Sequence, residues 1–545
     1  METVTVALIL LLAVIVSGAV ARMLPISLPL PLVQIVIGVL IAAVADLGVQ
    51  LRPDIFFLLF LPPLLFLDGW SIPKEGLFRD KGTILELAFG LVIFTVIGVG
   101  YFINWIIPAM PLAVAFALAA VISPTDPIAV SAIAARVPIP RRLMHIIEGE
   151  SLLNDASGLV CMRFAVAAVL TGSFSIAAAF GTFLWLVTGG IFIGVVVTGL
   201  VNMAKNWVSS RFGEETGSQI LISLLIPFGA YLLAENLHCS GILAAVAAGI
   251  TMSYAEQGGQ ALPVTRIRRN AVWSLVQFAA DGVIFVLLGE QLPQLFTGAA
   301  QVVRETGHRE PVWLLVHVII INLALAALRF VWVWTSLRFT LFRAHLKGER
   351  PYVPSWRLIA ATSVAGVRGA ITLAGVLTLP WTMNDGSPFP ARDLAIFLAG
   401  VIIVSLVAAS VTLPFLLRDL KLPPEPSHRE EEDRARIAAA EAAIQAIEQV
   451  QHDMGEGQSD ADLYSDAGVR IMALYRQRIE GRSKVGKEAE LAQKIDDIER
   501  RLRLVGLRAE RAELYRIARS RELSDELARK LVREVDLLES RLGMA

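Results

Sequence analysis

The sequence predicts an all-α polytopic membrane protein with about thirteen transmembrane helices, followed by a soluble helical domain. Hydrophobic residues make up 55% of the 545 residues and charged residues only 18%, against about a quarter charged in a soluble globular protein. The apolar residues recur in blocks of roughly 18 to 25, which is long enough to cross a bilayer as helices. After Arg418 the composition becomes strongly charged, which marks the start of the soluble part.

Several classes are excluded or disfavoured by composition. The net charge is -1, which gives no case for nucleic-acid binding. Cys161 and Cys239 both fall in apolar surroundings, so no disulfide framework is expected. The first apolar stretch, from about Val4 to Val20, lacks a basic leader. We therefore interpret it as the first span rather than as a cleaved signal peptide.

The apolar segments can be placed along the chain in order. Their approximate positions are 4–21, 28–46, 54–69, 83–107, 111–135, 145–170, 176–202, 217–236, 239–255, 270–292, 311–336, 356–380 and 393–417. Together they predict a transmembrane part over residues 1–417 and a tail over residues 418–545.

The loop charges predict an orientation. Alternate loops are rich in Lys and Arg, whereas the intervening loops are poor in both, apart from Arg52, Arg392 and the segment around Arg304 and Arg309. Basic loops remain on the cytoplasmic side of a membrane, so we expect the N-terminus outside and the C-terminus in the cytoplasm. The expected location is the cytoplasmic (inner) membrane. The basic residues are Arg22; Lys74, Arg79 and Lys81; Arg136, Arg141 and Arg142; Lys205 and Arg211; Arg266, Arg268 and Arg269; and Arg343, Lys347, Arg350 and Arg357.

The tail begins with a Pro-containing linker and continues as an alanine- and glutamate-rich helix. Near its end, "LSDELARKLVREVDLLESRL" has the pattern of an amphipathic helix with Ser524 as N-cap. We expect a helical domain whose apolar stripe packs against itself or a partner, such as a regulator, rather than a solvated spacer.

Ionisable side chains inside spans are costly and usually mark a transport pathway. Asp68 and Glu290 lie near span ends, whereas Asp126 and Asp155 lie well inside. Two facing aspartates would also fit an intramembrane protease, but the GxGD, HExxH and GxSG elements of such proteases are absent from the sequence, and we expect no enzymatic activity. The full set is Asp68, Asp126, Glu150, Asp155, Asp281, Glu290, Arg329 and Arg368.

The stretch "SPTDPIAV", residues 123–130, predicts a broken helix in the fifth span. Pro124 and Pro127 each remove a backbone donor and obstruct the helix. Irregular backbone inside a bilayer is tolerated where it is buried in protein or lines a wet cavity. Its free carbonyls can bind a cation, and Asp126 can cap the second half-helix. A purely capping role for Asp126 is the alternative, and the two roles are compatible.

A second break is predicted at "SVAGVRGAITLAG", residues 363–375 of the twelfth span. Gly366 and Gly369 bracket Arg368, which can neutralise the carbonyl ends that the break exposes. The two breaks are seven spans apart, so the second unit would insert upside down relative to the first. Interrupted helices in two inverted repeats are typical of secondary transporters with a site at the bilayer midplane.

A polar cluster follows in "EGESLLNDASG", residues 148–158. Ser151 and Asp155 are four residues apart and share a helix face. Carboxylate, hydroxyl and carbonyl oxygens are the ligands that hard cations prefer. A membrane-buried carboxyl group also holds a proton readily. A group that binds either a cation or a proton, never both, couples two opposite fluxes.

These three motifs together resemble the signature segments of monovalent cation/proton antiporters, in the branch of bacterial NhaP-type sodium/proton antiporters and animal sodium/proton exchangers. The resemblance covers about residues 1–417, and the tail resembles that of bacterial YjcE-like members. It implies a homodimer in the lipid bilayer, with a dimerisation domain and a six-helix core domain in each protomer. It also implies elevator-like alternating access and the exchange of Na⁺, or of K⁺ or Li⁺, for H⁺, without any cofactor.

The resemblance further assigns residue roles by position. Asp155 would be the exchanging carboxylate, with Asp126, Ser151 and the backbone of Thr125 completing the cation site. Asp68 would contribute through water. The Asn154–Asp155 pair, in place of two aspartates, implies an electroneutral one-to-one exchange. Glu150 and Arg329 would form a structural ion pair that Asn154 orients.

Some alternatives remain open at the level of sequence. Asp281 lies either at the cytoplasmic ion funnel or beside an arginine whose charge it balances. The chain could also be a cation channel, although paired broken helices with a titratable acid disfavour this, or an ion sensor that signals through its tail. The ligand types do not select among Na⁺, K⁺ and Li⁺.

Overall fold

A computed structural model gives the three-dimensional structure of the chain. It describes residues 2–25, 28–44, 53–127, 130–131, 141–171, 176–257, 262–305, 312–346, 355–380, 382–383, 385–392, 394, 400–418, 428–455, 461–483, 487–520 and 523–543. The chain divides into two compact units, Met1–Leu420 and Lys421–Ala545.

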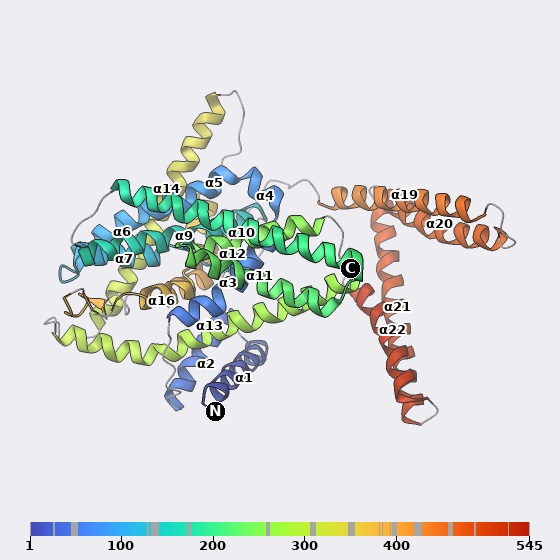
Figure 1. Cartoon of the computed structure of the whole chain (residues 1–545), viewed down its shortest axis with the longest axis horizontal. Coiled ribbons are helices and arrows are strands. Elements are labelled where there is room, and N and C mark those ends of the chain that lie inside the picture. The colour runs from blue at the N-terminus through green and yellow to red at the C-terminus, as the bar shows by residue number, and fades with distance from the viewer. Residues whose placement is uncertain are drawn as a thin grey trace. The chain divides into compact units, whose positions relative to one another are not determined.

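The first unit is built from helices in the described ranges (Figure 1). In chain order they are α1 (Glu2–Met23), α2 (Leu30–Val44), α3 (Pro53–Ser71), α4 (Lys74–Arg79), α5 (Lys81–Leu85), the π-helix η1 (Glu86–Leu91), α6 (Val92–Ile106), α7 (Leu112–Ile122), α9 (Arg141–Thr171), α10 (Ile176–Phe212), α11 (Thr216–Asn236), α12 (Gly241–Gln257), α13 (Pro263–Glu305), α14 (Val312–Leu346), α15 (Trp356–Val364), α16 (Ala370–Leu377) and α18 (Val401–Leu417).

The helices coincide with the apolar segments of the sequence. Within the described residues, seven helices are long and apolar enough to cross a membrane, and five shorter apolar helices accompany them. A polytopic helical membrane protein is therefore confirmed, while the count of thirteen spans and the inverted repeat stay predictions. Some helices extend beyond their apolar segment: α13 runs for 43 residues from Pro263 to Glu305, because polar flanking turns continue a helix outside the hydrocarbon core.

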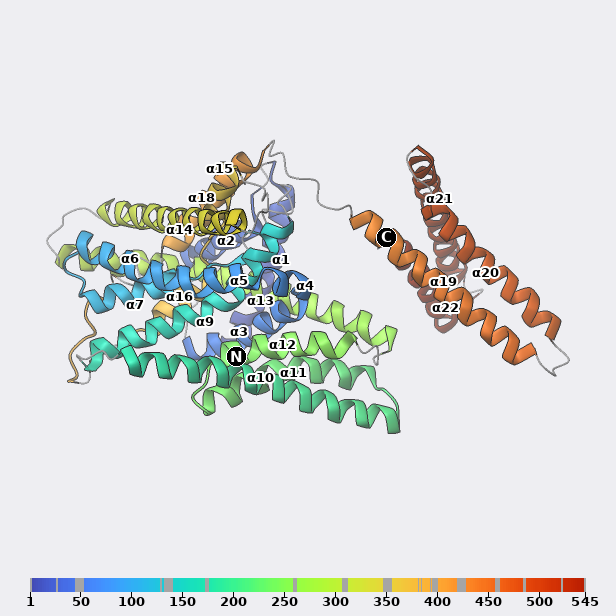
Figure 2. The same cartoon turned by 90° about the horizontal axis from the view of Figure 1, so that it is seen from above.

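Small residues allow the helices to approach closely, as is usual between membrane helices. A Cβ atom on Gly289 of α13 would collide with the backbone of Ile35 in α2, and one on Gly249 of α12 would collide with the backbone of Phe66 in α3. Figure 2 shows α10, α11 and α12 running side by side. These helices pack together with α3 and α13 and form one side of the unit, which we call the α3/α13 side.

Both predicted helix interruptions are present. α7 ends at Ile122 and residues 123–126 are not helical, while residues 365–369 separate α15 from α16. The two breaks meet, because the Asp126 N–H donates to the Val367 carbonyl at 2.7 Å. Most of the half-helix expected after Pro127 lies outside the described residues.

A π-helical turn that contacts α9 is a feature that the sequence did not reveal. η1 interrupts the helix formed by α5 and α6, and π turns inside α-helices are frequent at functional sites. The Ser157 hydroxyl of α9 lies 2.6 Å from the Ala88 carbonyl of this turn. This contact ties η1 to the turn of α9 that follows Asn154 and Asp155.

The second unit consists of two helical hairpins. α19 (His428–Gly455) packs on α20 (Ala461–Ser483), and α21 (Lys487–Arg519) packs on α22 (Asp525–Gly543). The N-cap predicted for the last helix is confirmed, since the Leu527 N–H donates to Ser524 Oγ at 3.4 Å. The charged composition after Arg418 is thus that of a separate helical domain.

Candidate functional site

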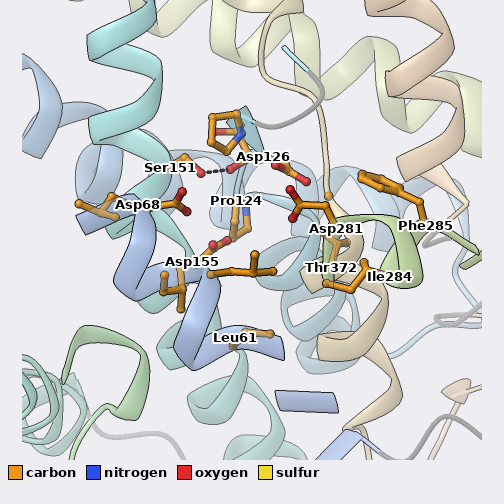
Figure 3. Close-up of a pocket in the computed structure, with 16 residues that line it drawn as sticks. Leu61, Asp68, Pro124, Asp126, Ser151, Asp155, Asp281, Ile284, Phe285 and Thr372 are labelled. Atoms are coloured by element: carbon orange, nitrogen blue, oxygen red, sulfur yellow. Dashed lines mark hydrogen bonds between the residues drawn. The ribbon is translucent and has the colours of Figure 1, made fainter. Parts of the chain in front are cut away.

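A cavity lies between the broken helices and the α3/α13 side of the first unit (Figure 3). Its volume of about 50 Å³ is enough for a few water molecules. The lining comes from α3 and α13 on one side and from the α7 break, α9 and α16 on the other. The residues are Leu61, Leu64, Leu65, Asp68, Pro124, Thr125, Asp126, Pro127, Ser151, Leu152, Asp155, Asp281, Ile284, Phe285, Gly369 and Thr372.

Four aspartates from four different elements line this cavity. Figure 3 shows the side chains of Asp68, Asp126, Asp155 and Asp281 pointing toward a common space. Four ionised carboxylates around one buried space would repel each other strongly. The cavity therefore suits protons or cations, either of which removes that repulsion.

Thr125 connects the break to α9 through both its backbone and its side chain. The Ser151 hydroxyl donates to the Thr125 carbonyl at 2.6 Å, and the Asn154 amide Nδ2 donates to Thr125 Oγ1 at 2.9 Å. Thr125 Oγ1 in turn donates to Glu150 Oε1 at 3.3 Å. The unwound backbone is thereby fixed against α9, with Thr125 only 2% exposed and Asn154 fully buried.

Glu150 and Arg329 form a buried ion pair next to this network, as expected. Two parallel hydrogen bonds link them, from Nη1 to Oε1 at 2.5 Å and from Nη2 to Oε2 at 2.6 Å. Arg329 Nε also donates to the Thr362 carbonyl at 3.1 Å, near the end of α15. Neither residue lines the cavity. The Asn154 amide donates to Thr125 Oγ1 and reaches the ion pair through that hydroxyl, so its contact orients the broken helix rather than the pair directly.

Arg368 neutralises carbonyl ends at both breaks. Its Nε donates to the Ile122 carbonyl at 2.9 Å, at the end of α7, and its Nη1 donates to the Gly366 carbonyl at the end of the α15 segment. A positive charge at the negative end of a helix dipole is stabilising. One buried arginine thus holds the ends of two half-helices together, which the sequence predicted for the second break alone.

Residue 369 must be a glycine because the side chain of Asp126 occupies the space beside it. A Cβ atom at residue 369 would collide with the Asp126 carboxylate. Gly366 has the same function for Arg329, whose Cδ and Nε would lie 3.0 Å from an added Cβ. The two glycines that bracket Arg368 therefore make room for one cavity aspartate and for the buried ion pair.

Asp281 lines the cavity, which disfavours its interpretation as the partner of an arginine, while a place in the cytoplasmic funnel stays a prediction. Within the described part of the chain it makes no ion pair with an arginine, and its Oδ1 is buried without a hydrogen-bond partner. Thr372 of α16 is a further lining residue that sequence reasoning missed, although it lies only three residues after Gly369. Glu290, by contrast, lies outside the cavity and accepts a hydrogen bond from Gln291 Nε2 at 2.6 Å.

Comparison with known proteins agrees with this architecture. A family model described as "Sodium/hydrogen exchanger, transmembrane" matches residues 7–419. The chain is 42% identical to the "Uncharacterized Na(+)/H(+) exchanger YjcE" of Escherichia coli (strain K12), over 98% of each protein. It is 36% identical to the "Sodium, potassium, lithium and rubidium/H(+) antiporter" of Bacillus subtilis (strain 168), over 99% of this chain and 78% of that protein.

A solved structure shares the fold. The sodium proton antiporter MjNhaP1 from Methanocaldococcus jannaschii matches with a TM-score of 0.59 at 17% identity, over 77% of this chain and 99% of that chain. With a family match that spans three quarters of its length, the chain belongs to the sodium/hydrogen exchanger family and is a cation/proton antiporter.

Proposed function

We propose that the protein exchanges one monovalent cation for one proton across the cytoplasmic membrane, with Na⁺ as the main cation and Asp155 as the group that binds both in turn. A broader range that includes K⁺ and Li⁺ is the second candidate. It is supported by the 36% identical Bacillus subtilis relative, which is named for sodium, potassium, lithium and rubidium.

The observation that carries the proposal is the position of Asp155. Its side chain is 6% exposed and lines the cavity with three other aspartates, all on different elements. The preceding residue, Asn154, is held by Thr125 and has an amide that neither takes up nor releases a proton. One carboxylate of the pair therefore titrates. Exchange of one cation against one proton at that carboxylate moves no net charge.

The oxygens of the cation site come from the break and from α9. Asp126, the Thr125 carbonyl and the Ser151 hydroxyl supply hard oxygen ligands beside Asp155, and Asp68 contributes through water. The Ser151–Thr125 hydrogen bond at 2.6 Å places two of these oxygens together. Each retains a lone pair for a cation. Asp281 adds negative charge at the edge of the same cavity.

The cavity lies at the boundary between two groups of helices, which suits a mechanism of alternating access. Asp68 and Asp281 belong to α3 and α13, whereas Thr125, Asp126, Ser151 and Asp155 belong to the broken helix and α9. An elevator-like shift of the broken-helix side against the α3/α13 side would open this boundary first to one face and then to the other. We propose that the α3/α13 side also forms a homodimer, with the N-terminus outside and the tail in the cytoplasm.

The test is transport by Asp155→Asn in proteoliposomes with an imposed pH gradient and a trapped pH dye. We expect the dye signal on addition of Na⁺ to be abolished, because an amide cannot exchange a proton for a cation. Asp385→Asn, in the exposed loop before α18, is the matched control and should transport normally. Dequenching that survives in Asp155→Asn would contradict the assignment.

The same assay shows which cation is transported and whether the protein works as an electroneutral exchanger or as a channel. Li⁺, Na⁺ and K⁺ are each added across a pH range, and an imposed membrane voltage tests electroneutrality. We expect saturable flux that stops without a counter-ion and does not respond to voltage. Flux that persists without a counter-ion would instead indicate a channel.

A further inference from the structure

Helix α21 of the tail has two apolar faces on opposite sides. One face packs against α22, where Ala528, Val532 and Val535 are buried. Polar contacts fix this packing, among them Arg500 Nε to the Leu542 carbonyl at 2.7 Å and Arg511 Nη1 to Asp536 at 2.8 Å. This hairpin contact leaves the other face of α21 free of α22.

The second face is a stripe of large apolar residues that remains uncovered. Its members are Leu491, Ile495, Ile498, Leu502 and Val505, each between 55% and 66% exposed. Their spacing alternates between four and three residues, and Ala509 and Ala512 continue it. A stripe with this 3.5-residue period is the seam of a left-handed coiled coil, in which the partner is another helix with the same period. An ordinary surface helix would place polar residues here.

The charges beside the stripe favour a second copy of α21 as the partner. Lys494, Arg501 and Arg508 follow one edge, and Glu499 and Glu513 follow the other. In a parallel pair of identical helices, a residue on the first edge faces the residue five positions later on the second helix. Lys494 then faces Glu499 of the second copy, and Arg508 faces Glu513. In an antiparallel pair the basic edges would face each other, which is repulsive.

The present partners of these charges do not prevent the pairing. Arg508 contacts Glu539 of α22 at 3.1 Å, and Glu499 contacts Arg503 one turn away at 2.5 Å. Both arginines are more than 60% exposed in these pairs, and Glu539, which is 20% exposed, keeps Arg511 as a second partner at 2.6 Å. Exposed ion pairs contribute little stability, so they can be exchanged or shared at small cost.

Membrane insertion favours the same geometry. Copies of one chain insert with the same orientation, so their tails emerge from the same face of the membrane. Two such copies are related by a two-fold axis normal to the membrane, which makes helices beside that axis parallel. We propose that α21 pairs with α21 of a second copy of this chain as a parallel, in-register coiled coil through Leu491, Ile495, Ile498, Leu502 and Val505.

The test uses disulfide cross-linking of the full-length protein in membranes. Cys161 and Cys239 are first replaced by alanine, and a single cysteine is then introduced as Ile498→Cys in the stripe or as Asp496→Cys two residues away on an exposed side of the same helix. Under mild oxidation we expect Ile498→Cys to give a covalent dimer and Asp496→Cys to give none. Equal cross-linking at the two positions, or none at Ile498→Cys, would overturn the proposal.

Charge reversal tests the direction of the pair in the Ile498→Cys protein. Lys494→Glu should reduce the covalent dimer, because it places two glutamates opposite each other twice per dimer. Adding Glu499→Lys should restore the dimer, because the glutamate at position 494 then faces a lysine at position 499 of the second copy. An increase of the dimer with Lys494→Glu alone would indicate an antiparallel pair and reject the model of parallel helices. A dimer held only by the membrane unit would not distinguish position 498 from position 496.

Discussion

The buried Glu150–Arg329 pair shows how a charge in the membrane unit can belong to the scaffold rather than to the transport site. Both side chains are nearly inaccessible, at 1% and 2% exposure, and their hydrogen bonds link α9 to α14 and to the end of α15. Removing one partner of such a pair leaves an uncompensated buried charge, which costs about 3–5 kcal/mol. The effect of substitutions here should therefore be on folding.

We expect Arg329→Met to lower the yield of folded protein in detergent, measured by size-exclusion chromatography and thermal unfolding. The double variant Glu150→Gln with Arg329→Met should recover much of that loss, because no charge is then left unpaired while Thr125 keeps its acceptor. Normal yield of Arg329→Met together with an altered cation preference would place the pair in the ion site instead.

Asp281 is the residue whose role the structure changes most. It lines the cavity with Asp155, and we expect its carboxylate to attract a cation there while Asp155 exchanges the proton. At an effective dielectric constant of about 20, two unit charges in one small cavity attract each other by roughly 2 kcal/mol. Asp281→Asn should therefore raise the KM for Na⁺ by roughly tenfold or more while exchange continues.

The measurement for Asp281 is the KM in proteoliposomes, with Asp281→Glu as the conservative control. Retention of affinity in Asp281→Glu would assign the effect to charge. If Asp281→Asn instead lowered the folded yield and left KM unchanged, the carboxylate would have a structural role.

At the scale of the elements, the site depends on two helix breaks that hold each other. The Asp126 N–H bonds to the Val367 carbonyl, and Arg368 bonds to the Ile122 and Gly366 carbonyls. Each break thus supplies the missing hydrogen-bond partners of the other, which is the condition for irregular backbone at membrane depth. Gly369 of the second break allows their close approach, because a Cβ atom there would collide with Asp126.

Gly369→Ala should strongly reduce exchange with little effect on insertion, because the new Cβ would displace the Asp126 carboxylate from the cavity. The matched control is Gly199→Ala in α10, where nothing lies within 4 Å of the added atom. Alanine favours a helix over glycine by about 1 kcal/mol, so the control should be neutral or slightly stabilising. Equal loss of transport in both variants would show that the effect is not specific to the break.

At the scale of the whole molecule, every cavity residue belongs to the first unit, and the tail has helical hairpins of its own. Truncation before Lys421 should therefore leave cation/proton exchange intact in proteoliposomes. A shifted pH profile in the truncated protein would show that the tail is regulatory. Loss of exchange in a truncated protein that is inserted and folded would show that transport itself needs the tail.

The sequence by itself determined the helical membrane class and the two breaks, and it predicted several cavity residues and the arginine of the second break, because prolines, glycines and charges are conspicuous in apolar segments. Asp126, Asp155, Ser151 and Arg368 were found in this way. The sequence could not decide between a funnel and an arginine partner for Asp281, nor reveal Thr372 or the π turn at Glu86–Leu91, because these depend on which helices pack together. Only the tertiary structure brought α3, α9, α13 and the two breaks around one space. Pairing between residues far apart in the chain is a property of packing, which local pattern does not encode.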